Sequence, residues 1–241
     1  MHIRFLGTGA ADWLASPPGG ESRRMTSTLF DGALLVDMTA YALERITDAE
    51  AITDILITHS HSDHFDPEAI ARIAPVTLHV DEGWTDRVRI DGVTVRPVKP
   101  GEKFTAGGYE VIGMHGNHST EGEHTVHYLL MKDGKALYYA TDCAWLLYRE
   151  AQLIREHPLD ALVIDATIGD GHEGDYRVFE HNSLPMVRIM AQSMRKTGML
   201  RPDAPIFLTH LARTLHGSQA ELEAANPAPY VVCKDGLTAE I

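Results

Sequence analysis

Four short apolar runs of this 241-residue chain each end directly in a histidine or an aspartate. The run at residues 55–58 precedes His59, and similar runs precede Asp142, Asp165 and His210. Runs this short and this rich in Ile, Val, Leu and Tyr predict buried strands. A single strand must end at something polar, but four endings in His or Asp form a pattern. Because ligands collect at the carboxyl ends of strands in layered α/β folds, we expect these side chains to meet at one edge.

The rest of the chain predicts a mixed α/β fold in one domain over residues 1–241. The composition is that of a globular protein, with 44% hydrophobic and 23% charged residues. Further strands are predicted at residues 3–6, 34–36, 76–80, 109–114 and 126–131, and the runs before Asp142, Asp165 and His210 span residues 136–141, 161–164 and 206–209. Helices are predicted at residues 66–73, 144–156, 183–196 and 218–225. Residues 17–20 are expected to form a loop, residues 97–101 a connection between strands, and residues 131–135 a hairpin turn.

The segment His59-Ser60-His61-Ser62-Asp63-His64 carries the strongest chemical signal. It follows a predicted strand and places three imidazoles and one carboxylate within six residues. A loop can turn His59 and His61 toward one ion and Asp63 and His64 toward a second. Imidazole and carboxylate ligands suit Zn, Fe, Mn or Ni, and the absence of thiolates argues against a closed structural zinc site.

This segment resembles the metal-binding signature of the metallo-β-lactamase superfamily. The resemblance extends from Leu-Gly-Thr-Gly-Ala at residues 6–10 to Leu-Thr-His at residues 208–210. It implies an αββα sandwich with two divalent metal ions at one edge of the sheets, zinc or manganese in the first place and iron or nickel as alternatives. The implied ligands are His59, His61 and His118 for one ion, Asp63, His64 and His210 for the other, and Asp142 as the bridge.

The third histidine ligand is the least defined member of this set. His118 lies in Gly-Asn-His-Ser and matches the family best, but His115 remains an alternative in the same stretch. His124 and His127 lie near or inside the next predicted strand, which favours a core or cross-strand role for them.

Departures from other members narrow the function. The best-known zinc β-lactamases carry Cys where this chain has Asp142, and Cys143 comes one position later. Oxygen-reducing diiron members carry Glu in place of His61, which argues against a redox role. The opening turn at residues 6–10 resembles the phosphodiesterase branch, which includes the tRNA 3′-processing endonucleases and the cyclic phosphodiesterase of phosphonate breakdown, although it can also be only a tight turn. The cysteine cluster of the phosphonate enzyme and the basic arm of the tRNA enzymes are both missing.

The resemblance implies hydrolysis by a hydroxide held between the two metals, with Asp63 orienting it. The leaving oxygen needs a proton, and His181 or His216 can supply it because imidazole titrates near neutrality. His181 also precedes a predicted helix, so a helix-start role is an equal alternative. Asp37 and Asp165 are expected to orient metal-binding imidazoles.

Charge and composition limit the partners. The formal net charge of −13 argues against nucleic acid as a partner, but a small anionic substrate remains compatible with bound metals. Arg23 and Arg24 lie in a Gly/Ser-rich loop, where solvation is expected and contact with an anion is the alternative. We see neither a signal peptide nor a membrane span, and two cysteines are too few for a disulfide framework, so we expect a cytoplasmic protein. A homodimer remains open.

These observations favour a phosphodiesterase acting on a small phosphodiester or cyclic phosphate. The first alternative is a lactonase or amide hydrolase that uses the same metals. A non-catalytic binding protein of the same fold is the second alternative, but it predicts a missing ligand and the sequence lacks none.

Overall fold

The computed structural model describes residues 1–15, 21–118 and 120–241; the loop expected at residues 17–20 lies outside this part of the chain. The strands form two seven-stranded sheets. The order in the first sheet is β14 (Thr238–Glu240), β1 (His2–Gly7), β2 (Ser27–Phe30), β3 (Leu34–Val36), β4 (Asp54–Leu56), β5 (Val76–Asp81) and β6 (Val93–Val98). The order in the second is β13 (Tyr230–Val232), β12 (Ile206–Thr209), β11 (Ala161–Asp165), β10 (Lys135–Ala140), β9 (Val126–Lys132), β8 (Tyr109–His115) and β7 (Lys103–Ala106).

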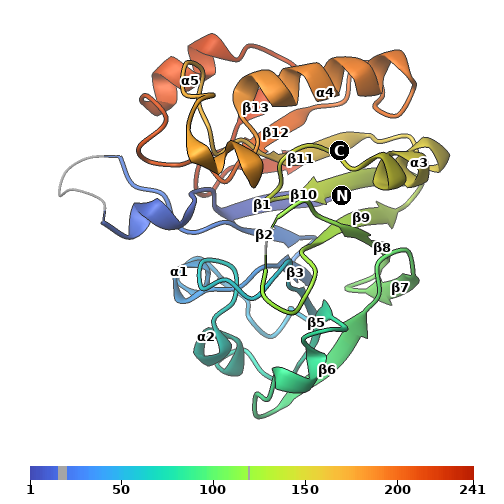
Figure 1. The fold of residues 1–241 in the computed structure, drawn as a ribbon. Helices are drawn as coiled ribbons and strands as arrows, with labels where there is room; N and C mark the ends of the chain where they lie inside the picture. Colours follow the sequence, from blue (N-terminus) through green and yellow to red (C-terminus); the bar gives the residue numbers. More distant parts are fainter. Residues whose placement is uncertain (16–20, 119) are drawn as a thin grey trace.

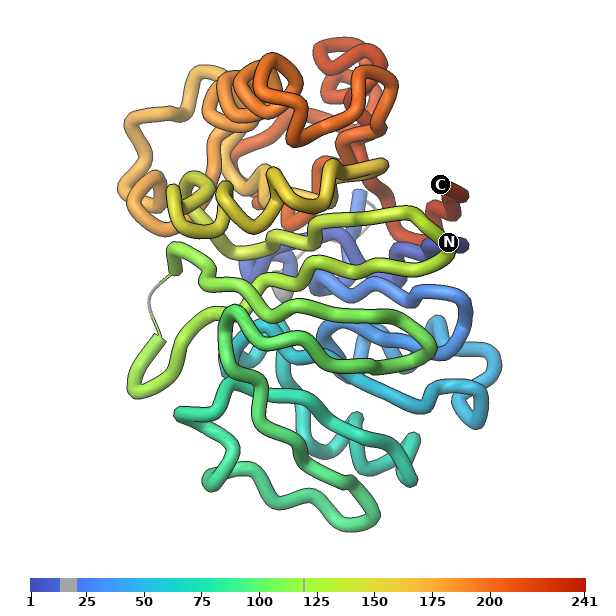
Figure 2. The backbone as a smooth tube through the Cα atoms, turned by 90° about the vertical axis from the view of Figure 1, so that its right-hand side faces the viewer, coloured from blue at the N-terminus to red at the C-terminus, as the bar shows by residue number. Residues whose placement is uncertain are grey.

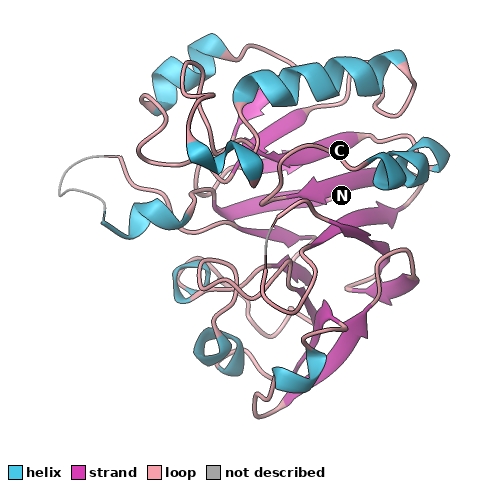
Figure 3. Cartoon of the chain, viewed as in Figure 1, coloured by secondary structure: helices cyan, strands magenta, loops and turns pink. Residues whose placement is uncertain are grey.

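Helices lie on the outer sides of the two sheets (Figures 1 and 3). The first sheet is covered by α1 (Ala40–Leu43) and α2 (Pro67–Ala71), and the second by α3 (Tyr148–Glu156), α4 (Leu184–Lys196) and α5 (Gln219–Ala225). Short 3₁₀ helices occur at η1 (Ala11–Ala15), η2 (Thr85–Arg87) and η3 (Tyr176–Phe179).

Alternation along the strands explains these layers. On β10, Leu137 and Tyr139 pack into a core between the two sheets, while Tyr138 and Ala140 pack into a second core beneath α3 and α4. A third core lies between the first sheet and its helices. Since successive side chains of a strand point to opposite faces, a sheet that is apolar on both faces needs a layer on each side. The predicted αββα sandwich is confirmed.

The predicted helices are present, with differences at their ends. α4 begins after Ser183, whose hydroxyl accepts a hydrogen bond from Met186 N, and α5 begins after Ser218 in the same way. α2 ends two residues before the predicted residue 73. The start predicted for α3, residue 144, is wrong, because Trp145 has a φ of +65° and its N–H donates to Asn182 Oδ1 (2.8 Å). Residues 144–147 therefore form a loop beside α4.

All the predicted strands are present, but the interpretation of residues 97–101 as a connection is wrong at its start. Pro97 and Val98 belong to β6, which pairs only with β5 at the edge of the first sheet. Pro97 lacks an N–H but fits an edge strand, where one side needs no partner. The predicted hairpin is confirmed: Asp133 and Gly134 both have positive φ, as a tight two-residue turn between β9 and β10 requires.

The two ends of the chain meet in the first sheet (Figure 2). β1 pairs antiparallel with β14, and the amino group of Met1 donates to the carbonyl of Ile241 (3.1 Å). In the described parts of the chain, no helix combines the length and the apolar character that crossing a membrane requires.

The expectation that Arg23 is solvated in a loop is wrong. Its side chain is buried, and its guanidinium donates to Thr8 Oγ1 (2.7 Å), the carbonyl of Cys233 (2.6 Å) and Gln219. Burial lowers the pKa of Arg23, although Asp235 acts in the opposite direction. The Arg23 side chain is therefore tied to the C-terminal part of the chain rather than open to an anion.

Candidate metal centre

The strand-end residues meet at one edge of the two sheets, as predicted. Asp37 follows β3, Asp142 follows β10 and His210 follows β12, and all three have positive φ between 52° and 59°. A non-glycine residue in this region is strained, and such strain persists where the surrounding structure fixes the side chain. Asp142 and His210 belong to groups of metal-capable side chains, and Asp37 Oδ2 lies 2.7 Å from His64 Nδ1.

The seven predicted ligands form overlapping groups. The ligand atoms of His59, His61 and His118 lie within 4.8 Å of one another, and so do those of Asp63, His64 and His210. Asp142 belongs to two further groups, one with His59 and His64 and one with Asp165, His181 and His210. It therefore links the first two groups, and its Oδ2 lies 2.6 Å from His64 Nε2 and 3.2 Å from His210 Nε2. His118, not His115, completes the first group among the described residues.

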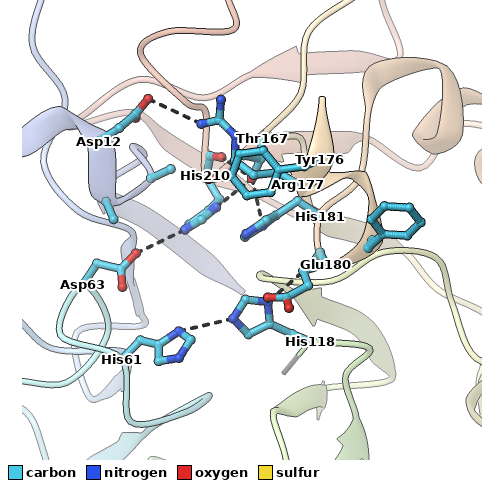
Figure 4. Close-up of a pocket in the computed structure, with 13 residues that line it drawn as sticks. Asp12, His61, Asp63, His118, Thr167, Tyr176, Arg177, Glu180, His181 and His210 are labelled. Atoms are coloured by element: carbon cyan, nitrogen blue, oxygen red, sulfur yellow. Dashed lines mark hydrogen bonds and ion pairs between the residues drawn. The ribbon is translucent and has the colours of Figure 1, made fainter. Parts of the chain in front are cut away.

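Figure 4 shows how these side chains face the cavity, with His61 and His118 on one side and Asp63 and His210 on the other. His118 Nε2 lies 3.2 Å from His61 Nδ1, and His210 Nε2 lies 3.5 Å from Asp63 Oδ2. Two ligand atoms at such a distance from each other can coordinate the same metal ion.

Four buried atoms of the cluster make no hydrogen bond to any described residue: His59 Nε2, His64 Nε2, Asp142 Oδ2 and His210 Nε2. An unsatisfied buried polar group costs about 1–3 kcal/mol, so such groups require an explanation. His64 Nε2 and Asp142 Oδ2 lie close to each other but not in a hydrogen-bonding direction, as suits atoms that face a common cation. The donor set therefore fits divalent metal ions.

The outward nitrogens of these imidazoles are held in place. Thr58 Oγ1 lies 3.0 Å from His59 Nδ1, Asp37 Oδ2 2.7 Å from His64 Nδ1, and Thr167 Oγ1 2.8 Å from His210 Nδ1. Such bonds fix the ring orientation and leave Nε2 for the metal. Asp37 contacts the ring of His64, a predicted metal ligand, as its expected role requires. Thr58 and Thr167 were not predicted, because threonines at strand ends are too common to be informative.

The cluster also controls the charge of its members. Burial holds the pKa of His59 well below its usual range, and the neighbouring His64 adds to the effect. His59 is therefore neutral, the form in which imidazole binds a metal. Burial would raise the pKa of Asp142, but His210 and His64 lower it well below its usual range, so the carboxylate stays ionised.

His181 lies at the wall of the same cavity. Its Nδ1 is 2.8 Å from Asp165 Oδ2 and 3.5 Å from Asp142 Oδ1. Burial opposes protonation, but the charges of Asp165 and Asp142 raise the pKa of His181 to about 9. The bond to Asp165 fixes Nδ1 and leaves Nε2 as the nitrogen for the cavity. Asp165 thus orients His181 at close range, whereas His210 Nδ1 is 3.7 Å away.

His216 is not placed to donate a proton to a substrate, which corrects the sequence-based expectation. Its Nε2 donates to the carbonyl of Ala166 (2.8 Å), and its Nδ1 is buried behind Gly169. It is absent from the described lining of the cavity. The ring supports the loop after β11 instead.

The other neighbouring histidines also lie outside the cluster. His127 on β9 is buried, with Nδ1 2.8 Å from Tyr138 Oη and Nε2 3.0 Å from the carbonyl of Thr141. The predicted core role of His127 is confirmed. His124 is exposed, with Nδ1 3.4 Å from Asp81 Oδ2, and its ring contacts that of His115.

A cavity of about 530 Å³ opens over the cluster. Its far wall is formed by Asp12 of η1 and by Tyr176, Arg177, Phe179 and Glu180 of the segment around η3. None of these residues was predicted, because the sequence contains no signal for which loop reaches the site.

Residues 28–204 match the family described as the beta-lactamase superfamily domain, which is more than half of the chain. The chain belongs to the beta-lactamase superfamily. The resemblance noted in the sequence is thus confirmed. Members of this fold are mainly metal-dependent hydrolases, so the chain is a hydrolase of this superfamily, with clustered histidines and aspartates suited to divalent metals.

Solved structures share the whole fold at low sequence identity. The metallo-beta-lactamase fold protein YhfI from Bacillus subtilis is 13% identical, with a TM-score of 0.76 and coverage of 99% of this chain and 98% of that chain. A diphosphatase from the PhnP family is 21% identical, with a TM-score of 0.74 and coverage of 99% and 97%. The short form of human tRNase Z is 18% identical, with a TM-score of 0.73 and coverage of 100% and 99%. No curated protein matches the sequence significantly.

Proposed function

We propose that this member of the beta-lactamase superfamily is a metal-dependent phosphodiesterase that acts on a small phosphodiester or cyclic phosphate. The observation that carries the proposal is the convergence of seven metal-capable side chains, four of which present buried atoms without hydrogen bonds. The opening turn at residues 6–10 and the likeness to a PhnP-family diphosphatase and to tRNase Z favour phosphorus over carbonyl carbon.

We assign the metal ligands from the groups of side chains whose ligand atoms lie close together. His59, His61 and His118 would hold one ion, and Asp63, His64 and His210 the other, with Asp142 between them. Two divalent ions, when bound, supply Lewis-acid activation of a water and stabilise charge on the phosphoryl oxygens.

The chain's own residues complete the reaction. Asp63 lines the cavity, and its Oδ2 lies 3.5 Å from His210 Nε2, so its carboxylate is placed to orient the attacking water. His181 presents Nε2 to the cavity and donates the proton that the leaving oxygen needs, while Asp165 holds its other nitrogen. Because Asp165 fixes the ring, the proton is aimed at one position above the cluster.

We also propose that residues 1–241 act as one domain on a small-molecule substrate. The pairing of β1 with β14 supports this, because both ends of the chain contribute to one sheet.

The first test is turnover of bis(p-nitrophenyl) phosphate by metal-stripped protein reloaded with Mn or Zn. We expect metal-dependent hydrolysis. His61→Ala should lower it by at least about 100-fold, because losing even a group that only hydrogen-bonds a metal ligand costs about 10- to 100-fold. His124→Ala is the matched control, because it removes an exposed histidine outside the cluster and should retain activity. No turnover by protein shown to hold two metals would refute the phosphodiesterase assignment, and a panel of lactones would then be the next substrate class.

The second test concerns the proton donor. His181→Ala should slow substrates with an alkoxide leaving group by about 100-fold or more, since these need a proton. It should slow p-nitrophenyl esters only a few-fold, because p-nitrophenolate leaves unprotonated. His216→Ala serves as control and should keep the wild-type ratio between the two substrates. Equal losses of His181→Ala on both substrates would show that His181 has a structural role only.

A further inference from the structure

The wall of the cavity opposite the metal-ligand cluster is aromatic. Tyr176 and Phe179, the ends of η3, both line the cavity and expose 78% and 79% of their surface. We call these two side chains the aromatic wall. Large exposed apolar side chains at a cavity mark a surface that binds something.

The aromatic wall is held by polar contacts at its base. Asp175 caps η3 by accepting from Arg177 N (2.9 Å) and binds the Arg177 guanidinium through both oxygens (2.8 and 3.0 Å). Arg177 also reaches Asp12 (3.8 Å), as Figure 4 shows. Asp12 in turn accepts from Arg213 N and Thr214 N, so η3 is fastened to the loop after β12.

The charges around the aromatic wall favour an uncharged group there. Arg177 is the one lysine or arginine among the described lining residues, and two carboxylates already pair with it. Asp12 and Glu180 contribute negative charge to the same side of the cavity. A second anionic group of a substrate would therefore be repelled at this wall, while the metal side attracts the first.

The size of the cavity agrees with a substituted ligand. About 530 Å³ lies within the range of roughly 300–1,000 Å³ for sites of drug-sized molecules. A phosphate with only methyl substituents would leave the aromatic wall in water.

We propose that the aromatic wall binds a planar, uncharged substituent of the substrate, an aryl group or a nucleobase, while its phosphoryl group lies at the metal side. The proposal rests on the proposed function for the position of the phosphoryl group. It narrows the substrate class to phosphoesters with one flat ring, and it makes Tyr176 and Phe179 specificity-determining residues.

Binding, rather than turnover, tests the aromatic wall. Metal-loaded protein is titrated calorimetrically with phenylphosphonate, cyclohexylphosphonate, methylphosphonate and adenosine monophosphate. We expect phenylphosphonate to bind roughly 2- to 13-fold more tightly than methylphosphonate, the range expected for one aromatic pair. Phe179→Ala should remove this preference and leave the affinity for methylphosphonate unchanged.

Tyr148→Ala is the matched control. Tyr148 on α3 is 80% exposed but does not line the cavity, so its removal should keep the preference. Tighter binding of adenosine monophosphate than of phenylphosphonate identifies a nucleobase as the ring, and the reverse order identifies a simple aryl group.

Equal affinities for phenyl- and methylphosphonate would overturn the proposal. So would equal affinities for the phenyl and the non-planar cyclohexyl compound, since stacking requires a flat ring. Both results are independent of whether p-nitrophenyl esters are hydrolysed, so failure of the phosphodiesterase assignment is seen separately.

Discussion

At the scale of single residues, neighbouring histidines of one sequence stretch have opposite roles because of their surroundings. His118 faces the cavity beside His61, whereas His127 is enclosed between Tyr138 and the carbonyl of Thr141. The second environment suits a neutral ring with its proton on Nε2, because Nδ1 accepts from the tyrosine and Nε2 donates to the carbonyl. The two residues are of the same chemical type. Their different roles follow from the burial and the hydrogen-bond partners of each ring.

His127 therefore makes stability depend on pH. Burial lowers its pKa from 6.5 to about 4, so the unfolded chain binds a proton in this interval that the folded chain does not. The free energy of unfolding should thus rise with pH between these values and fall as the pH drops below 6.5. At pH 4.5 the contribution is about 2–3 kcal/mol.

The measurement is urea unfolding of metal-free protein at pH 7 and pH 4.5, for the wild type and for His127→Gln. Other titrating groups are common to both proteins and cancel in the difference. The variant should lose about 2–3 kcal/mol less than the wild type on acidification. Identical losses would show that His127 does not take up this proton.

At the scale of elements, the interior strands other than β2 were predictable and the edge strands were not. β10, β11 and β12 are buried runs, and each was located from its apolar residues. β6, β7, β13 and β14 are the outermost strands of the two sheets, and their residues are largely half-buried or exposed. Because an edge strand meets water, its apolar run is short or interrupted and is harder to find in the sequence.

β2 was missed for a different reason. It lies inside the first sheet and is fully buried, but half of its residues are Ser27 and Thr28. Their hydroxyls are satisfied by the carbonyl of Asp37 and by Tyr139. Only these tertiary partners make a polar strand tolerable in the interior.

At the scale of the whole molecule, Arg23 connects segments from the two sheets. Its guanidinium joins Thr8 just after β1, Cys233 just after β13, and Gln219 of α5. Arg23→Met should cost about 2–4 kcal/mol of unfolding free energy, since it leaves several buried acceptors without a donor.

Arg24→Met provides the control. Arg24 pairs with Glu44 at the surface, and an exposed pair contributes about 1 kcal/mol or less. Urea unfolding of both variants at a fixed metal concentration compares the two arginines. Similar small losses for both would show that the buried contacts of Arg23 do not hold the sheets together.

The sequence by itself determined the superfamily, the layered fold and the set of metal-capable residues, because these depend on apolar periodicity and on residue types at short spacing. His59, His61, Asp63 and His64 are close in the chain, so local geometry already brings them near one another. The sequence did not determine which of His181 and His216 reaches the cavity, nor that Tyr176 and Phe179 form its far wall. Both features depend on the positions that distant loops take over the sheet edge. These loops lie about 100 residues or more from the segment at residues 59–64. Loop positions follow from buried polar contacts such as Arg177 with Asp12, which exist only once the chain has folded.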